Sequence, residues 1–281
     1  MSNIQKSVWA IAATVIVYLV VAAPPPLGDE AMQSRIPIRE VFEILQQENA
    51  KVREIYTREI VSEGKKQGYQ FDEKWQDESI HAGPLPAQYL RETARYLEQS
   101  QIHLGLFLLS DYAINTANNV DGTHRALLQR VRQTRESQLM QIPDTGQFAY
   151  MAPDIAGVDA CVDCHNKHPE SPKTDWRRDD VMGAVTWIYQ SEFVSVDEVI
   201  QMIAVLRQGF VAAYQHVLTE LSQIQDAPEI GDRWPREGRY LPSKEVFLQE
   251  IEQQVSWVSM RMIKRLVSAQ TETIAARGSV P

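Results

Sequence analysis

The chain has 281 residues, of which 44% are apolar and 23% are charged, a composition typical of one large or two small globular domains and not of a disordered chain. Acidic residues outnumber basic ones by 37 to 28, so the net charge is −9. Basic residues cluster only in pairs, which argues against a nucleic-acid-binding protein. The only two cysteines, Cys161 and Cys164, are too few for a disulfide-rich scaffold or for a four-cysteine metal site within the chain.

An uncharged apolar stretch covers residues 8–23, between a polar start that contains Lys6 and three prolines at 24–26. As a helix it would rise about 24 Å, slightly less than the ~30 Å hydrocarbon core of a membrane. It is therefore either a membrane anchor or a cleaved signal peptide, and we expect an anchor, because prolines suit a cleavage site poorly. Lys6 before the stretch and Asp29 after it place the N-terminus in the cytoplasm. We expect a single-pass protein of the inner (cytoplasmic) membrane, with its body in the periplasm or on the extracytoplasmic side.

The exported body alternates between helical and extended patterns. Apolar periodicity predicts helices over 38–63, 87–99 and 122–138, and short apolar or β-branched runs predict strands over 102–109, 146–150 and 183–190. Ser195 and Glu198 have the spacing of a capping box at the start of a helix whose apolar face runs to Leu221. A last helix over about 243–270 packs either on the same domain or on a partner protein.

Strands enclosed by long helices predict an α+β protein. We expect three parts, which are an anchor with a proline-rich stem over 1–28, a domain over 29–192 and a C-terminal helical extension over 193–281.

Residues 161–165 read Cys-Val-Asp-Cys-His, the CxxCH pattern of covalent c-type haem attachment. Two thiols three residues apart can bond both vinyl groups of one porphyrin, and His165 then supplies an imidazole as proximal iron ligand. Three other interpretations stay open: a structural disulfide, a thioredoxin-like redox pair, which would need a βαβ context, and a zinc site with His168, which would need a fourth ligand. Because haem c is attached outside the cytoplasm, an exported body favours haem.

The run ACVDCHNKHPESPKTDWRRDDVMGAV, which starts at Ala160, resembles the c-type haem family with a PAS-like sensor fold, as do AGPLPA and SDYAIN upstream of it. That family includes sensor modules of histidine kinases and stand-alone exported proteins. The resemblance covers residues 38–190 and is most specific over 161–183. It implies one haem c held against a small antiparallel sheet surrounded by long helices, with Cys161 and Cys164 as thioether sites and His165 as the proximal ligand.

The resemblance leaves the second axial ligand open. Some relatives use a cysteine in the first long helix, and the matching position here is Leu45, which cannot bind iron. Either another side chain takes the sixth position or the iron is five-coordinate. Candidate distal ligands are His81 beside a rigid turn, His103 in a predicted strand, where it is alternatively a core histidine, and then His124 and Met151. Candidate neighbours of the haem propionates are His168, Lys173, Arg177 and Arg178, although solvated charges are the default.

Haem c either passes single electrons or reports redox state or a bound gas. We expect a membrane-anchored mono-haem cytochrome that transfers electrons, as a subunit of a larger membrane complex, because no kinase or cyclase module is recognised in these residues. The alternative is a redox- or gas-sensing haem c module that signals through a partner. An enzyme is the weakest hypothesis, because no second haem motif is present. The expected partners are the membrane and a redox partner or complex subunits that dock through the C-terminal helices, and no nucleic acid.

Overall fold

The computed structural model describes residues 35–77, 79–224, 227–232, 240–255, 259–261 and 264. The expected membrane segment at 8–23 lies outside these residues. Within them, no helix has both the length and the apolar character that a membrane crossing requires. The described residues from Ile36 onward form one compact unit of the α+β class.

A long helix opens this unit, as the apolar periodicity predicts. It consists of α3 (Ile38–Ile55), a π-helical segment η1 (Tyr56–Ser62) and a final turn α4 (Glu63–Lys66). One stripe of α3 is fully buried, including Phe42 and Leu45. This stripe packs on the sheet, where the ring of Phe42 stacks on that of Tyr150 with centroids 5.7 Å apart.

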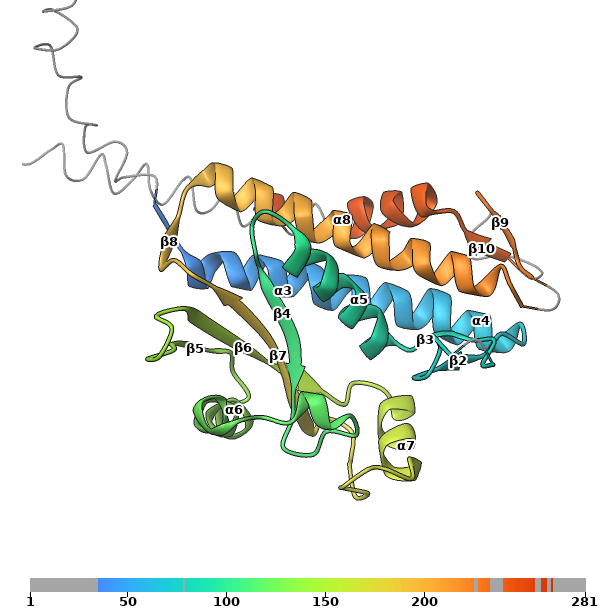
Figure 1. Ribbon diagram of the computed structural model, residues 1–281, viewed down its shortest axis with the longest axis horizontal. Helices are drawn as coiled ribbons and strands as arrows, with labels where there is room; N and C mark the ends of the chain where they lie inside the picture. Colours follow the sequence, from blue (N-terminus) through green and yellow to red (C-terminus); the bar gives the residue numbers. More distant parts are fainter. Residues whose placement is uncertain are drawn as a thin grey trace, which may run out of the picture. The chain divides into compact units, whose positions relative to one another are not determined.

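The central sheet has four antiparallel strands in the order β4-β7-β6-β5, namely β4 (Gly105–Leu109), β7 (Val181–Tyr189), β6 (Phe148–Ile155) and β5 (Gln138–Gln141). The register pairs Tyr150 and Leu106 with Trp187, one from each neighbouring strand. Side chains alternate between the two faces of a strand. These three residues therefore bury one face against α3, while Met151 and Ala184 bury the other against α6 (Gly122–Thr134). Figure 1 shows α3 and α6 on opposite sides of the sheet.

Two further helices complete the layer that contains α3. The helix α5 (Pro86–Gln99) lies against α8 (Val196–Leu221), and the Tyr89 hydroxyl of α5 donates a hydrogen bond to the Phe210 carbonyl of α8 at 2.9 Å. The predicted capping box is confirmed, because Ser195 accepts from the Glu198 N–H and Glu198 accepts from the Ser195 N–H. The described residues also form three short two-stranded pairs outside the central sheet. They are β1 (Ile36–Pro37) with β8 (Phe193–Val194), β2 (Phe71–Asp72) with β3 (Gly83–Pro84), and β9 (Glu229–Gly231) with β10 (Tyr240–Pro242).

A helix over 244–255 follows β10. Its apolar side chains Phe247, Ile251 and Val255 are buried in the same core as α3 and α8. The Phe247 ring stacks on that of Tyr214 with centroids 4.1 Å apart. The described part of the last predicted helix thus packs on its own chain, and its role in docking a partner stays a prediction.

Three sequence predictions need correction. The helix predicted over 122–138 ends at Thr134, because Arg135 takes a left-handed conformation with φ 58°, and residues 138–141 form β5. The strand predicted over 102–109 begins only at Gly105, and His103 lies before it with φ 50°. The strand predicted over 146–150 is longer and runs from Phe148 to Ile155 as β6.

Candidate functional site

The CxxCH residues lie on a short helix, α7 (Asp159–Lys167), in the connection between β6 and β7. Residues three apart on a helix are neighbours on its surface, so Cys161 and Cys164 project from the same side. Both cysteines are free, Cys161 partly buried and Cys164 exposed. None of the α7 side chains is fully buried. The thiols are therefore placed where a single group could bond both.

Interactions from outside α7 fix its position. The side chain of Asn166 is hydrogen-bonded to the backbone of Trp176, and Arg178 donates to the Gly157 carbonyl at 2.7 Å, just before the helix starts. Cys161 packs against a small apolar cluster of Ala156, Trp176 and Met182. This cluster forms an apolar wall beside the CxxCH residues.

His168 has both ring nitrogens engaged. The Glu170 N–H donates to His168 Nδ1 at 3.1 Å, so Nε2 carries the proton and donates to Glu73 Oε1, also at 3.1 Å. Neither nitrogen is left to bind a metal, which weighs against a zinc site that includes His168. Across the described part of the chain, no three His, Cys, Asp or Glu side chains form a cluster suited to a metal ion.

The other residues considered as propionate neighbours also have protein partners or face solvent. Lys173 forms an ion pair with Asp175 and its Nζ lies 4.6 Å from the centre of the Trp176 ring. Arg178 lies 3.4 Å from Asp159, and Arg177 is exposed. The contacts of Lys173 and Arg178 thus lie within the 171–178 segment, which leads back to β7, and between this segment and α7.

An ion pair between distant parts of the chain adjoins α7. Arg53 Nη1 of α3 lies 3.1 Å from Asp154 Oδ1 of β6. Burial raises the pKa of the Cys161 thiol; the Asp154 charge raises it further, and the Arg53 charge lowers it. Burial lowers the pKa of His165, and Asp154 partly offsets that shift. A lowered pKa keeps the imidazole neutral at neutral pH, which is the form that binds metals.

Among the buried polar atoms that lack hydrogen-bond partners within the described residues, several belong to α3, to the CxxCH motif and to its apolar wall. They are both side-chain amide atoms of Asn49, Arg53 Nε, His165 Nδ1 and Trp176 Nε1. A buried polar atom without a partner costs about 1–3 kcal/mol. These features together fit a haem c group. The donor set consists of two free thiols and a neutral imidazole, and it lies beside an apolar wall and polar atoms that lack partners.

The candidate distal ligands do not gather at His165. His103 is exposed and precedes the end of β4 where Gly105 pairs with Ile188, whereas α7 adjoins the opposite end of the sheet, roughly 20 Å away along the strands. Its prediction as a strand residue is wrong, because it lies in a turn where Nδ1 contacts the Glu98 carbonyl at 3.3 Å. His81 is exposed in the loop before β3.

Two further candidates lie on the other side of the sheet. Met151 is fully buried and belongs to the cluster packed on α6, whereas Asp154, three residues along the same strand, faces α3. His124 lies on α6, where its Nδ1 is 2.8 Å from Asp121 Oδ1 and its ring meets Phe107 edge-on. Leu45 is buried in the main apolar core. The sheet thus separates Met151 and His124 from the CxxCH side.

The sequence interpretation missed Asn49, Arg53 and Asp154. Arg53 and Asp154 are 101 residues apart, and no local pattern links them. The sequence did contain a signal for Asn49. This residue falls on the apolar stripe of the first helix, one turn after Leu45, where a polar side chain must find a buried partner.

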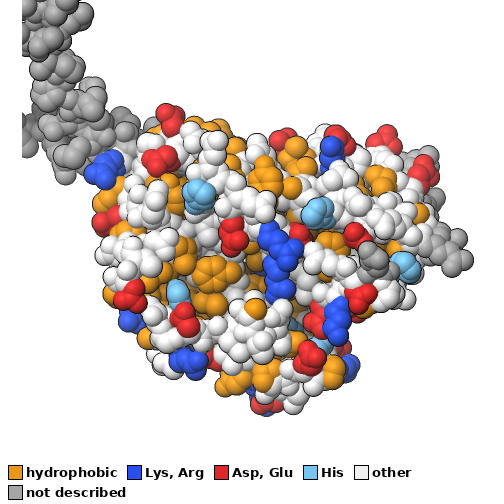
Figure 2. All heavy atoms as spheres, viewed as in Figure 1, with side chains coloured by type: hydrophobic (Ala, Val, Ile, Leu, Met, Phe, Trp, Pro, Cys, Tyr) orange, Lys and Arg blue, Asp and Glu red, His pale blue; other side chains and the backbone are white. Residues whose placement is uncertain are grey.

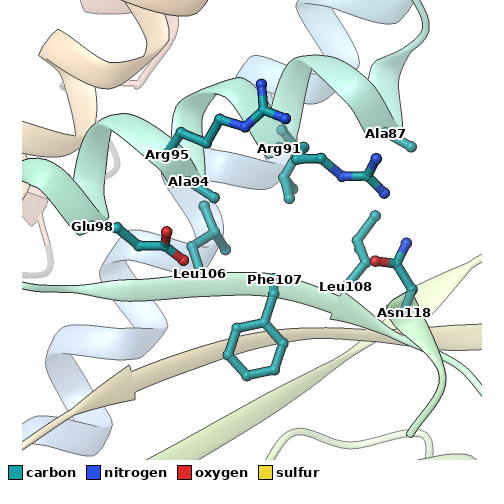
Figure 3. A pocket seen from close by; sticks show the side chains of 10 residues that line it. Ala87, Arg91, Ala94, Arg95, Glu98, Leu106, Phe107, Leu108 and Asn118 are labelled. Atoms are coloured by element: carbon teal, nitrogen blue, oxygen red, sulfur yellow. The ribbon is translucent and has the colours of Figure 1, made fainter. Parts of the chain in front are cut away.

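A separate cavity of about 220 Å³ lies between α5 and β4. Figure 3 shows the guanidinium of Arg91 of α5 at the same end of the cavity as Leu108 and Asn118, which lie beside one another. In Figure 2, basic side chains over α5 border apolar ones over β4 on this face. Cys161, Cys164 and His165 are not among its lining residues, so the cavity is not the CxxCH site.

Comparison with protein-family models matches residues 31–189, more than half of the chain, to the Tll0287-like family. Neither the curated proteins nor the solved structures contain a match to the chain. The family is a c-type haem-binding domain, in agreement with the donor set on α7. The chain therefore belongs to the Tll0287-like family of c-type haem-binding domains.

Proposed function

We propose that the chain holds one haem c covalently through Cys161 and Cys164, with His165 as the proximal iron ligand. Each thioether forms when a thiol adds across a vinyl double bond: the sulfur bonds one vinyl carbon, the thiol hydrogen goes to the other, and no electrons are gained or lost. The free thiols on one side of α7 and the burial that keeps His165 neutral support this assignment.

We propose one-electron transfer as the activity of this site. When bound, haem c supplies an iron that alternates between the ferrous and ferric states. The observation that carries the proposal is the exposure of Cys164, because it puts one attachment point at the protein surface, where a redox partner can approach. Cys161, the other attachment point, packs instead against the apolar wall that includes Trp176 and Met182.

The finer assignments extend this proposal. An antiparallel sheet with helices on both faces supports a PAS-like fold for the family domain. We propose that residues 8–23 anchor the chain in the inner membrane, that the haem domain faces the periplasm, and that a redox protein or complex subunits are its partners. The apolar stretch and the charges around it support the anchor.

Covalent attachment can be tested by mass and spectrum. The full chain is produced in a host competent for cytochrome maturation and extracted from the membrane fraction. We expect a mass increase of one haem and a c-type pyridine haemochrome spectrum. Both are lost in the Cys161→Ala/Cys164→Ala variant and kept in His168→Ala, the matched control on the same segment. A wild-type mass equal to that of the bare polypeptide would refute the proposal.

A redox or gas sensor is the second candidate. It is favoured by the placement of His103, His124 and Met151 away from His165, which leaves the sixth iron position without these protein ligands. Spectra with and without CO separate the two functions. Low-spin spectra in both oxidation states that do not respond to CO support electron transfer alone, whereas a high-spin ferrous form that takes up CO supports sensing. His81→Ala tests the remaining candidate ligand. A changed spin state would identify His81 as the sixth ligand, and an unchanged spectrum would exclude it.

A further inference from the structure

We propose that the cavity between α5 and β4 binds a small organic carboxylate, an anion with one charged end and a short apolar body. Arg91 and Asn118 hold the carboxylate, and the apolar side chains between the helix and the strand cover the body. None of the CxxCH residues lines this cavity, so the inference goes beyond the proposed haem function and does not depend on it.

Arg91 supplies the positive charge of the site. Its side chain is partly buried and lines the cavity, yet it forms no ion pair or hydrogen bond with any described residue. Arg95, one turn farther along α5, also lines the cavity but is paired with the buried Glu92. A guanidinium presents parallel N–H groups that match the two oxygens of a carboxylate, and such charge-assisted pairs are strong. Arg91 is therefore the arginine of this cavity whose charge is available to a ligand.

Asn118 adds an amide at the same end of the cavity (Figure 3). It closes a short 3₁₀ turn, η2 (Thr116–Asn118), where its N–H donates to the Asn115 carbonyl at 2.9 Å. Its carbonyl accepts from the Ser110 N–H at 2.9 Å, which ties the turn to the end of β4. The side-chain amide has no partner in the described part of the chain. Because the backbone is already fixed, this amide can donate to a ligand oxygen at little cost in loop ordering.

The space between the helix and the strand is apolar and small. Leu90, Ala94 and Leu106 line it and are 2%, 7% and 0% exposed. Its volume of about 220 Å³ corresponds to on the order of seven water molecules at ~30 Å³ each and is below the usual range for drug-sized ligands. A short aliphatic chain would replace water along these side chains, which the hydrophobic effect favours. An inorganic anion would leave this apolar surface unused.

Glu98 limits the ligand to one negative charge. It lines the cavity two turns after Arg91, about 10 Å farther along the axis of α5. Figure 3 shows its carboxylate at the opposite end from the Arg91 guanidinium. No cation among the described residues is paired with the Glu98 side chain, so its charge repels a second carboxylate at that end. The cavity therefore favours a monocarboxylate over a dicarboxylate.

Titration calorimetry of the full-length protein with pentanoate tests the site, in a non-ionic detergent because a carboxylate detergent would compete. We expect saturable binding that weakens about tenfold or more in Arg91→Gln, which removes the charge. Arg130→Gln is the matched control. Arg130 is exposed on α6, has no partner among the described residues and does not line the cavity, so its loss removes the same charge elsewhere and should leave the affinity unchanged.

A second variant and three further probes sharpen the assignment. Asn118→Asp places a negative charge beside the ligand carboxylate and should abolish binding, and an unchanged thermal unfolding midpoint shows that the variant is folded. Glutarate, pentylamine and inorganic phosphate should each bind about tenfold or more weakly than pentanoate, because they add a second carboxylate, replace the carboxylate by a cation or lack the apolar body.

Each outcome bears on the inference separately from the haem proposal. Absence of pentanoate binding in the wild type, or equal affinity of the wild type and Arg91→Gln, overturns it. Phosphate or glutarate that binds as tightly as pentanoate overturns the assignment to a monocarboxylate. The Cys161→Ala/Cys164→Ala variant should bind pentanoate as the wild type does. Failure of the haem proposal therefore leaves this inference standing, and binding that is lost with the haem overturns it.

Discussion

Asn166 and Trp176 are joined by two hydrogen bonds that run in opposite directions. Asn166 Nδ2 donates to the Trp176 carbonyl at 2.9 Å, and the Trp176 N–H donates to Asn166 Oδ1 at 2.8 Å. The pair ties the residue after the CxxCH histidine to the segment that returns to β7. Because the Trp176 ring also packs beside Cys161, this link positions the thiol together with the helix.

Asn166→Ala should lower the free energy of unfolding by about 1–3 kcal/mol, because it leaves two backbone groups of Trp176 without partners. For a protein of this size that corresponds to a fall of roughly 2–4 °C in Tm per kcal/mol. Thermal unfolding measures the change. Lys167→Ala is the control, because the Lys167–Asp163 pair is largely exposed and should contribute little. Equal stability of the two variants would show that the hydrogen bonds of Asn166 to Trp176 do not stabilise the fold.

The sequence predicted the elements whose residues pack by a regular period. Each of these elements has a strong local signal. The first helix has an apolar stripe, the helix that begins at Pro86 has a proline in its first turn, and the helix after Ser195 has a capping box. The helix α7 had none, because it buries no side chain fully and so lacks an apolar period. The mixed sequence of β5, Gln-Leu-Met-Gln, fits a helix end as well as a strand, and its pairing with β6 decides the outcome.

The candidate site was predictable only where its chemistry is local. Cys161, Cys164 and His165 follow from a five-residue motif. The Arg53–Asp154 pair depends on how α3 packs across β6, which no spacing in the sequence encodes. Where the distal candidates lie relative to the CxxCH residues could not be predicted for the same reason, since the face on which Met151 lies depends on the strand register.

Arg53→Gln and Asp154→Asn should shift the midpoint potential of the bound haem in opposite directions. The two side chains are less than one-third exposed, so water screens their charges only in part. Loss of the Arg53 charge leaves Asp154 to stabilise ferric iron and lowers the potential, whereas loss of the Asp154 charge raises it. Each variant should also cost about 1 kcal/mol of stability. Redox titration measures the potentials, and shifts of the same sign would show that the pair acts only through structure.

Arg207→Leu should be strongly destabilising. Glu48 is 0% exposed, and Arg207 binds it at 3.0 and 2.7 Å, while Ser259 also donates to it. Removal of the arginine leaves a buried carboxylate without its charge partner, at a cost of about 3–5 kcal/mol. The double variant Glu48→Met/Arg207→Leu removes both charges and should recover much of this loss. Chemical denaturation measures the free energy of unfolding of both variants. A double variant no more stable than the single one would argue against a charge effect.

Asp121 should make the stability of α6 depend on pH. Its carboxylate caps the helix by accepting from the His124 N–H at 3.1 Å, and it also contacts the ring nitrogen Nδ1 of that residue. These hydrogen bonds, first the backbone one, hold the pKa of Asp121 below its ordinary value. Because the folded-state pKa is the lower one, the stabilisation is complete above about pH 4, the ordinary range of an aspartate, and is lost as the pH falls through the folded-state pKa. Asp121→Ala should therefore cost about 1 kcal/mol at pH 7 and progressively less in acid, whereas Asp121→Asn keeps a capping oxygen at every pH. Denaturant titrations at pH 7 and near pH 3 test this, and a deficit of Asp121→Ala that stays constant over that range would show that the charge of Asp121 does not contribute.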